Sequence, residues 1–68
     1  MVKSTYLARM FRDWRSEKGL TQRQAAVYVG ISKASISRIE REVPIEHNIS
    51  TLTKLAKVLN IEIIDLVD

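Results

Sequence analysis

The chain has 68 residues, 46% of them hydrophobic and 28% charged, and a net charge of +3. A chain of this size forms one domain with a small core. The absence of cysteine, with a single histidine, His47, excludes a disulfide framework and a structural zinc site. No apolar run approaches the roughly 18 residues of a membrane span, and the N-terminus has no signal-peptide core. We therefore expect a soluble, cytoplasmic protein with no membrane partner.

Basic residues are concentrated in the first part of the chain. Residues 1–39 contain eight Lys and Arg and two acidic residues, whereas residues 40–68 contain three Lys and Arg and six acidic residues. The first part can attract a polyanion and the second cannot. An ordinary solvated surface explains the same distribution, so the charge alone does not decide between the two.

The first predicted helix begins at Ser4 or Thr5 and ends at Lys18. Apolar residues recur along it at the spacing of an amphipathic helix. Gly19 is suited to end the helix in the left-handed conformation. Trp14, on the apolar face, is interpreted as a core residue.

Two short helices joined by a glycine are predicted next. A T-x-x-Q capping box at Thr21 starts the first of them, Gly30 supplies the turn, and Ser32 is placed to cap the second, which runs to about Arg41. In a helix-turn-helix of this kind, here about residues 21–41, the second helix enters the major groove of DNA.

The second of these helices has a face of small and basic side chains. At about 100° per residue, Ile36 and Ile39 share a face that we expect to be buried. The opposite face and its flanks carry Ala34, Ser37, Arg38, Arg41, Lys33 and Ser35. Short side chains let a helix backbone approach the floor of a groove, and long basic ones reach base edges or phosphates. A solvated face that happens to be rich in Ser and Arg is the alternative.

The remainder of the chain is predicted to be a loop around Pro44 and a further helix. Asn48 is placed to cap that helix, and Asn60 to end it. The last eight residues, IEIIDLVD, suit a strand or one to two helical turns, and we expect a short helix. The expected fold class is all-α.

No catalytic or cofactor-binding pattern is present in the sequence. The serines lack a positioned base, and the two glycines form no phosphate-binding loop. We therefore expect no enzymatic activity, no cofactor and no metal site.

The segments RDWRSEKGLTQRQAAVYVGISKASISRIERE and NISTLTKLAKVLNIEIIDL resemble the XRE, or Cro/phage-repressor-like, family of helix-turn-helix domains. The resemblance covers nearly the whole chain and is to compact members such as SinR-type regulators and restriction–modification controller proteins. It implies a single five-helix, lambda-repressor-like domain over residues 1–68, in a bacterial or phage-encoded protein.

The sequence departs from the family pattern at four positions. Ala25 replaces a usual leucine, so the core is expected to be looser there or filled by Trp14. Glu42 stands near a position often held by Gly or Asn. Val27 and Tyr28 replace polar residues, and we expect them to be partly buried rather than exposed contacts.

The resemblance also implies roles for individual residues. The positions that face bases match Lys33, Ala34, Ser37 and Arg38. Those that meet phosphates match Gln22 and Ser35, and we extend this set to Thr21, Arg23 and Arg41. In the family, the residues at the positions of Arg15 and Glu40 form an ion pair, so the resemblance implies the same pair here. A phosphate contact by Arg15 is the alternative. Arg38 is the best candidate for a bidentate contact to guanine.

We accordingly expect a sequence-specific transcriptional regulator that binds double-stranded DNA as a homodimer on a palindromic operator, with repression or activation left open. The candidate dimer contacts are Val43, Pro44, Ile45, Ile63, Ile64 and Val67. One alternative is an antitoxin that binds a toxin or other protein partner and regulates its own synthesis. A purely structural interaction module is another, and it predicts no salt-dependent DNA binding.

Overall fold

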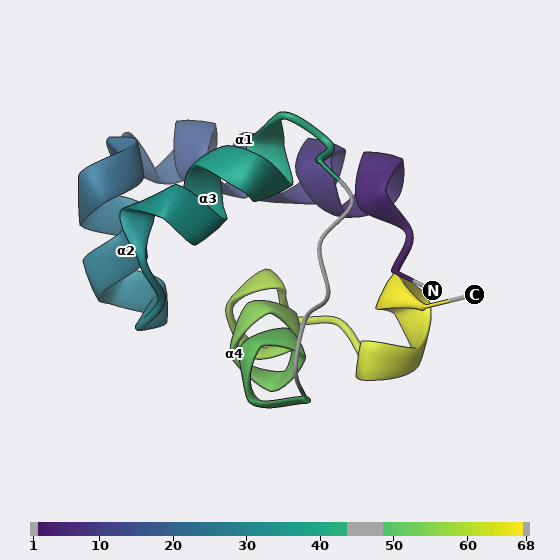
Figure 1. The fold of residues 1–68 in the computed structure, drawn as a ribbon. Helices are drawn as coiled ribbons and strands as arrows, with labels where there is room; N and C mark the ends of the chain where they lie inside the picture. Colours follow the sequence, from purple (N-terminus) through teal and green to yellow (C-terminus); the bar gives the residue numbers. More distant parts are fainter. Residues whose placement is uncertain (1, 44–48, 68) are drawn as a thin grey trace.

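The computed structural model describes residues 2–43 and 49–67, and the helices in this part of the chain follow one another without a sheet. They are α1 (Ser4–Lys18), α2 (Gln22–Val29), α3 (Lys33–Glu40), α4 (Ile49–Leu59) and the 3₁₀ helix η1 (Ile63–Leu66) (Figure 1). The all-α prediction is confirmed, but five α-helices are not found, because the last helical element is a single 3₁₀ turn. In the described ranges no helix has the length and apolar character needed to cross a bilayer.

Local capping chemistry sets the helix boundaries. Gly19, at φ 66°, ends α1, and Asn60, at φ 57°, follows α4. The Thr21 side chain accepts from the backbone N–H of Gln24, and the Gln24 side chain accepts from that of Thr21, which completes the predicted capping box. Helix α3 ends at Glu40, one residue before the predicted end. The proposed cap at Asn48 lies outside the described residues.

The C-terminal residues combine both structures that the sequence allowed. Ile63–Leu66 forms the 3₁₀ helix, and Val67 forms an isolated antiparallel bridge with Val2. The backbone N–H of Lys3 also donates to Leu66 O at 2.8 Å. The first and last described residues of the chain therefore lie side by side, as Figure 1 shows, and Leu66 is fully buried.

One hydrophobic core joins all five elements. Its largest fully buried side chains are Phe11, Leu7, Ile36, Leu55 and Leu66. Burial of each contributes about 1.5–3 kcal/mol. In Figure 1, α1 passes behind α3, and α4 lies below both, so the core is enclosed from three sides. Ala25 is fully buried despite its small size, and Trp14 is partly buried against the core.

Gly30 holds a backbone conformation that other residues adopt at a cost. Its φ is +87°, and a Cβ added there would meet only Lys54 Nζ, at 4.0 Å. Gly30→Ala is therefore expected to lower the free energy of unfolding by about 1–2 kcal/mol through backbone strain alone. Urea denaturation measures this, and Gly30→Asn is the matched control, because Asn tolerates the left-handed region better. Wild-type stability of the Ala variant would contradict a strained turn.

Candidate nucleic-acid interface

Helices α2 and α3 are connected by a tight turn that fixes their relative orientation. The backbone N–H groups of Gly30 and Ile31 both donate to Ala26 O, at 2.8 and 3.1 Å. Ala26 is itself buried, and its small side chain suits a position where two helices approach closely. Helix α3 packs against α1 and α2 (Figure 1), so one of its sides is covered and the other is free.

The covered and free sides of α3 agree with its helical periodicity. Ile36 is fully buried and Ile39 is 3% exposed, which confirms that they form the buried face. Lys33, Ala34 and Arg38 are exposed, and Ser37 is half-buried between them. The exposed side of α3 therefore presents two short side chains and two long cationic ones, with no acidic residue among them.

Ser32 caps α3 and also holds the side chain of Ser35. The Ser32 hydroxyl oxygen accepts from the backbone N–H of Ser35 at 3.1 Å and donates to Ser35 Oγ at 3.0 Å. Because Ser35 acts as the acceptor in this second bond, its own hydroxyl hydrogen can still donate to another group. The cap thus orients Ser35 at the first turn of α3.

A charged network connects α1, α2 and α3. Arg15 donates to the Glu40 carboxylate from Nε at 2.6 Å and from Nη2 at 2.8 Å. Its third nitrogen, Nη1, donates to Leu20 O at 3.0 Å. Gln22 Nε2 donates to Glu40 Oε1 at 3.2 Å. The structure thus brings together Arg15 and Glu40, whose side chains are 26% and 6% exposed. It adds Gln22, which the sequence indicated only as a phosphate contact.

The network determines the charge state of Glu40. Burial by itself raises the pKa of this carboxyl group, but hydrogen bonds from Arg15 and Gln22 and the positive charge of Arg15 outweigh it, so the net pKa is lowered. The hydrogen bond to Glu40 is the main cause of the raised pKa of Arg15. Both groups are therefore charged at neutral pH, and the pair holds α3 on α1.

The residues predicted to meet phosphates differ in how free they are. Arg23 is fully available on the exposed side of α2, and Thr21 is exposed beside it. Arg41 uses Nε to donate to Ser37 O at 3.3 Å, which leaves its two Nη groups for a ligand. Gln22 is half-buried and one of its amide hydrogens is directed to Glu40, so only the second hydrogen remains for a phosphate.

The chain leaves α3 through a Schellman-type end. Glu42, at φ 59°, donates its backbone N–H to Ile39 O, and Val43 donates to Arg38 O. A side chain at positive φ is strained, but the Glu42 carboxylate accepts from Thr5 Oγ1 at 2.7 Å and lies 4.0 Å from Arg12. These contacts with α1 explain why an acidic residue is found where Gly or Asn is more usual.

Val27 and Tyr28 are not partly buried, and that expectation is wrong. Their exposed fractions are 81% and 59%. They lie on the side of α2 that the core does not cover, since the buried residues Ala25, Ala26 and Val29 already occupy its inner face. The Tyr28 ring instead makes an edge contact with Trp14, with ring centroids 5.4 Å apart.

The residues predicted to form the dimer interface differ in how exposed they are. Ile64 is 75% exposed, whereas Ile63 and Val67 are half-buried against the core, because η1 and the bridge to Val2 turn them inward. Val43 is half-buried, and Pro44 and Ile45 lie outside the described residues.

The arrangement suits contact with a negatively charged partner, because the exposed side chains of α2 and α3 include Arg23, Lys33 and Arg38. Within residues 2–43 and 49–67 no three His, Asp or Glu side chains gather as a metal site would require. The same ranges leave no buried side-chain nitrogen or oxygen without a hydrogen bond. Helices α2 and α3 present an exposed basic surface. The hydrogen-bonded network of Arg15, Glu40 and Gln22 holds these helices together with α1.

Comparison with known proteins identifies the family. A family model described as helix-turn-helix matches residues 5–66. Over 62 residues the chain is 36% identical to the HTH-type transcriptional regulator SlrR of Bacillus subtilis (strain 168). This alignment covers 91% of the chain but 41% of SlrR, so the chain spans about two fifths of that relative. No solved structure is significantly similar. Because the family model covers almost all of the chain, the protein belongs to the XRE-like helix-turn-helix family.

Proposed function

We propose that this domain is the sequence-specific, double-stranded DNA-binding part of a transcriptional regulator and that α3 enters the major groove. The supporting observation is the free side of α3, where Lys33, Ala34 and Arg38 are exposed while Ile36 and Ile39 anchor the helix. A groove about 12 Å wide admits a helix whose facing side chains are short. The similarity to SlrR, an HTH-type transcriptional regulator, supports the assignment of this domain to a transcriptional regulator.

Each exposed side chain has a role that fits its chemistry. Arg38 donates two parallel hydrogen bonds to guanine, Lys33 reaches a second guanine or a nearby phosphate, and Ser37 donates or accepts. Ala34 packs on a thymine methyl group. Arg23, Arg41, Ser35, Thr21 and the N-terminus of α2 with Gln22 hold phosphates and set the register.

The domain acts as a homodimer on a palindromic operator in this proposal. Ile64 is the exposed apolar residue that would contribute most, and Val43, Ile63 and Val67 are further candidate contacts. Two reading helices related by a two-fold axis place half-sites about 34–36 Å apart, or a multiple of it. Sedimentation with and without operator DNA tests this, and a monomer in both conditions contradicts it.

Salt dependence provides the test of DNA recognition itself. Selection from random duplex DNA is expected to enrich a two-fold-symmetric site. If each protomer neutralises two or three phosphates, the slope of log K against log salt is about −4 to −5 for the dimer, and affinity falls about 10²- to 10³-fold between 50 and 200 mM salt. No enriched sequence, or binding that does not respond to salt, would contradict the proposal.

A second candidate is an antitoxin that also binds a partner protein. The observation that favours it is the exposure of Val27 and Tyr28, two apolar side chains adjacent on α2. Co-purification of a stoichiometric second protein that is lost on Val27→Ser would support it. Retention of the same protein by that variant would place the contact elsewhere.

A further inference from the structure

We propose that a groove between α1, α2 and α4 binds an acidic peptide segment of a partner protein, in which carboxylates alternate with apolar side chains. The groove has a volume of about 490 Å³. It contains no residue of α3, the helix proposed to read bases. This lysine groove is lined by two aromatic, two aliphatic and three basic side chains: Trp14, Tyr28, Val29, Val58, Lys18, Lys54 and Lys57.

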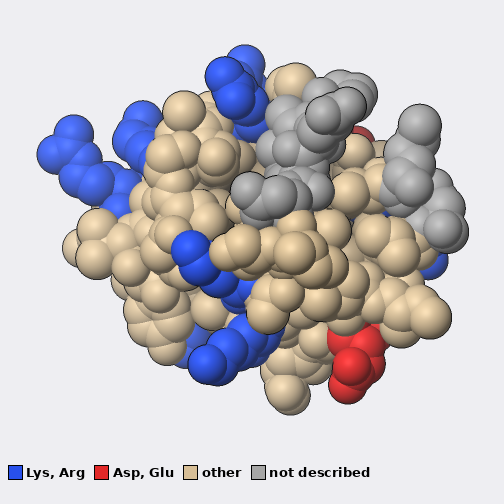
Figure 2. All heavy atoms as spheres, turned by 60° about the horizontal axis from the view of Figure 1, so that its bottom comes forward, with Lys and Arg blue, Asp and Glu red and all other residues tan. Residues whose placement is uncertain are grey.

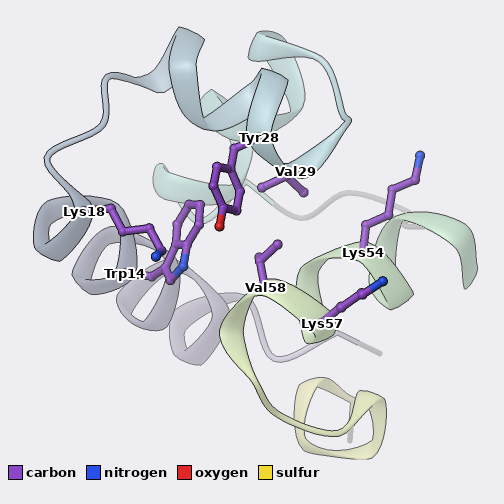
Figure 3. A pocket seen from close by; sticks show the side chains of 7 residues that line it. All are labelled: Trp14, Lys18, Tyr28, Val29, Lys54, Lys57 and Val58. Atoms are coloured by element: carbon purple, nitrogen blue, oxygen red, sulfur yellow. The ribbon is translucent and has the colours of Figure 1, made fainter.

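The floor of the lysine groove is apolar. Figure 3 shows Val29 and Val58 between the aromatic pair on one side and Lys54 and Lys57 on the other. Tyr28 is 59% exposed, and its hydroxyl points into the space between Trp14 and Val58 (Figure 3). An apolar side chain seated here would cover the valines and the edges of both rings. Burial of such a group is favourable at about 25 cal/mol per Å².

The rim of the lysine groove is positively charged. Three of the seven described lining residues are lysines, and none of them is acidic. Lys54 Nζ donates to Gly30 O at 3.2 Å, which leaves two of its three donors free. Figure 2, which brings the α4 side forward, shows basic side chains at several places on this face, with acidic groups toward its lower right and, partly hidden, at its upper right. A ligand with several carboxylates matches this charge.

The aromatic side chains favour a peptide over a single-stranded nucleic acid. Lys18 Nζ lies 5.9 Å from the Trp14 ring centroid and 5.6 Å from that of Tyr28. Trp14 also contacts Phe11, with ring centroids 5.3 Å apart. A base that stacked on the ring faces beside Lys18 would have to displace it, because nucleic-acid binding by aromatic platforms needs an open ring face. A carboxylate pairs with the Lys18 ammonium where it already lies.

Trp14 is the only tryptophan of the chain, so its fluorescence reports occupation of the lysine groove. The probe is a synthetic 12-residue peptide of four Glu-Glu-Leu repeats, titrated into the full chain. We expect a saturable change in Trp14 emission. Lys54→Glu/Lys57→Glu should weaken binding at least 10-fold. The matched control, Lys3→Glu/Arg9→Glu, makes the same charge change at exposed positions outside the groove and should alter the affinity less than 2-fold.

Further measurements separate the alternatives. A peptide of Glu-Glu-Ser repeats should bind at least 5-fold more weakly, because the apolar floor is then unused. Lys57→Glu alone retains the Lys54–Gly30 hydrogen bond and replaces the double variant if thermal melting shows that the latter is destabilised. Arg38→Ala should leave peptide binding unchanged, so failure of DNA recognition and failure of this proposal are distinguishable. Equal weakening by both double variants would overturn the proposal, as would tighter, groove-dependent binding of a 12-nucleotide oligothymidylate.

Discussion

Glu40→Gln is expected to lower the free energy of unfolding by about 2–3 kcal/mol, with a fall in Tm of about 10–20 °C. The substitution leaves Arg15 half-buried without a counter-charge, since Glu40 accepts two of its hydrogen bonds. Loss of one partner of a fully buried pair costs about 3–5 kcal/mol, and the 26% exposure of the Arg15 side chain reduces that figure. Thermal and urea denaturation measure the change.

Arg12→Gln is the matched control for Glu40→Gln. Arg12 lies 4.0 Å from Glu42 in a pair whose side chains are 52% and 44% exposed, and such surface pairs contribute about 0–1 kcal/mol. If Arg12→Gln lost as much stability as Glu40→Gln, burial would not be what determines the contribution of these ion pairs to stability. DNA affinity of Glu40→Gln, measured well below its Tm, separates the structural role from an indirect effect on recognition.

The pH dependence of stability gives an independent readout of the same pair. The folded-state pKa of Glu40 lies below its unfolded value, because the hydrogen bonds and positive charge of Arg15 and the hydrogen bond of Gln22 favour the carboxylate. The stabilisation is therefore fully present above that unfolded value and is lost as the pH falls through the folded-state pKa. Wild type should lose its advantage over Glu40→Gln as the pH is lowered from 6 toward 3. A difference in stability that is constant over this range would contradict a charged Glu40.

Arg38→Ala is expected to weaken operator binding by about 1–3 kcal/mol per half-site, or roughly 5- to 150-fold, and to relax the preference at one base pair. Arg38 is exposed on α3, and its backbone carbonyl, which accepts from Val43 N–H at 3.0 Å, remains in the variant. The fold should therefore be unchanged. Binding is measured with the selected operator and with single-base variants of it at a stated salt concentration.

Two arginines serve as controls for Arg38→Ala. Arg23→Ala should weaken binding to all sequences alike and reduce the salt slope by about one, as a phosphate contact does. Arg9→Ala changes an exposed arginine of α1 and should have little effect on sequence preference. Wild-type operator affinity for Arg38→Ala would show that the free side of α3 does not read bases.

Much of the helical architecture could be predicted from short-range patterns. The capping box at Thr21, the glycine at position 30 and the periodicity of Ile36 and Ile39 act within one or two helical turns, so neighbouring residues contain the whole signal. The last residues could not be assigned in this way. Residues 61–67 suit two local conformations, and pairing with Val2, distant in sequence, combines a 3₁₀ turn with a bridge.

The sequence by itself determined the all-α class, the helix-turn-helix unit and the basic face of α3, because each depends on residues close together along the chain. Only the tertiary structure decided that Gln22 joins the Arg15–Glu40 pair, that Val27 and Tyr28 are exposed, and that three helices enclose the lysine groove. Those features depend on distances between separate elements. They arise only when the core brings α1, α2, α3 and α4 together.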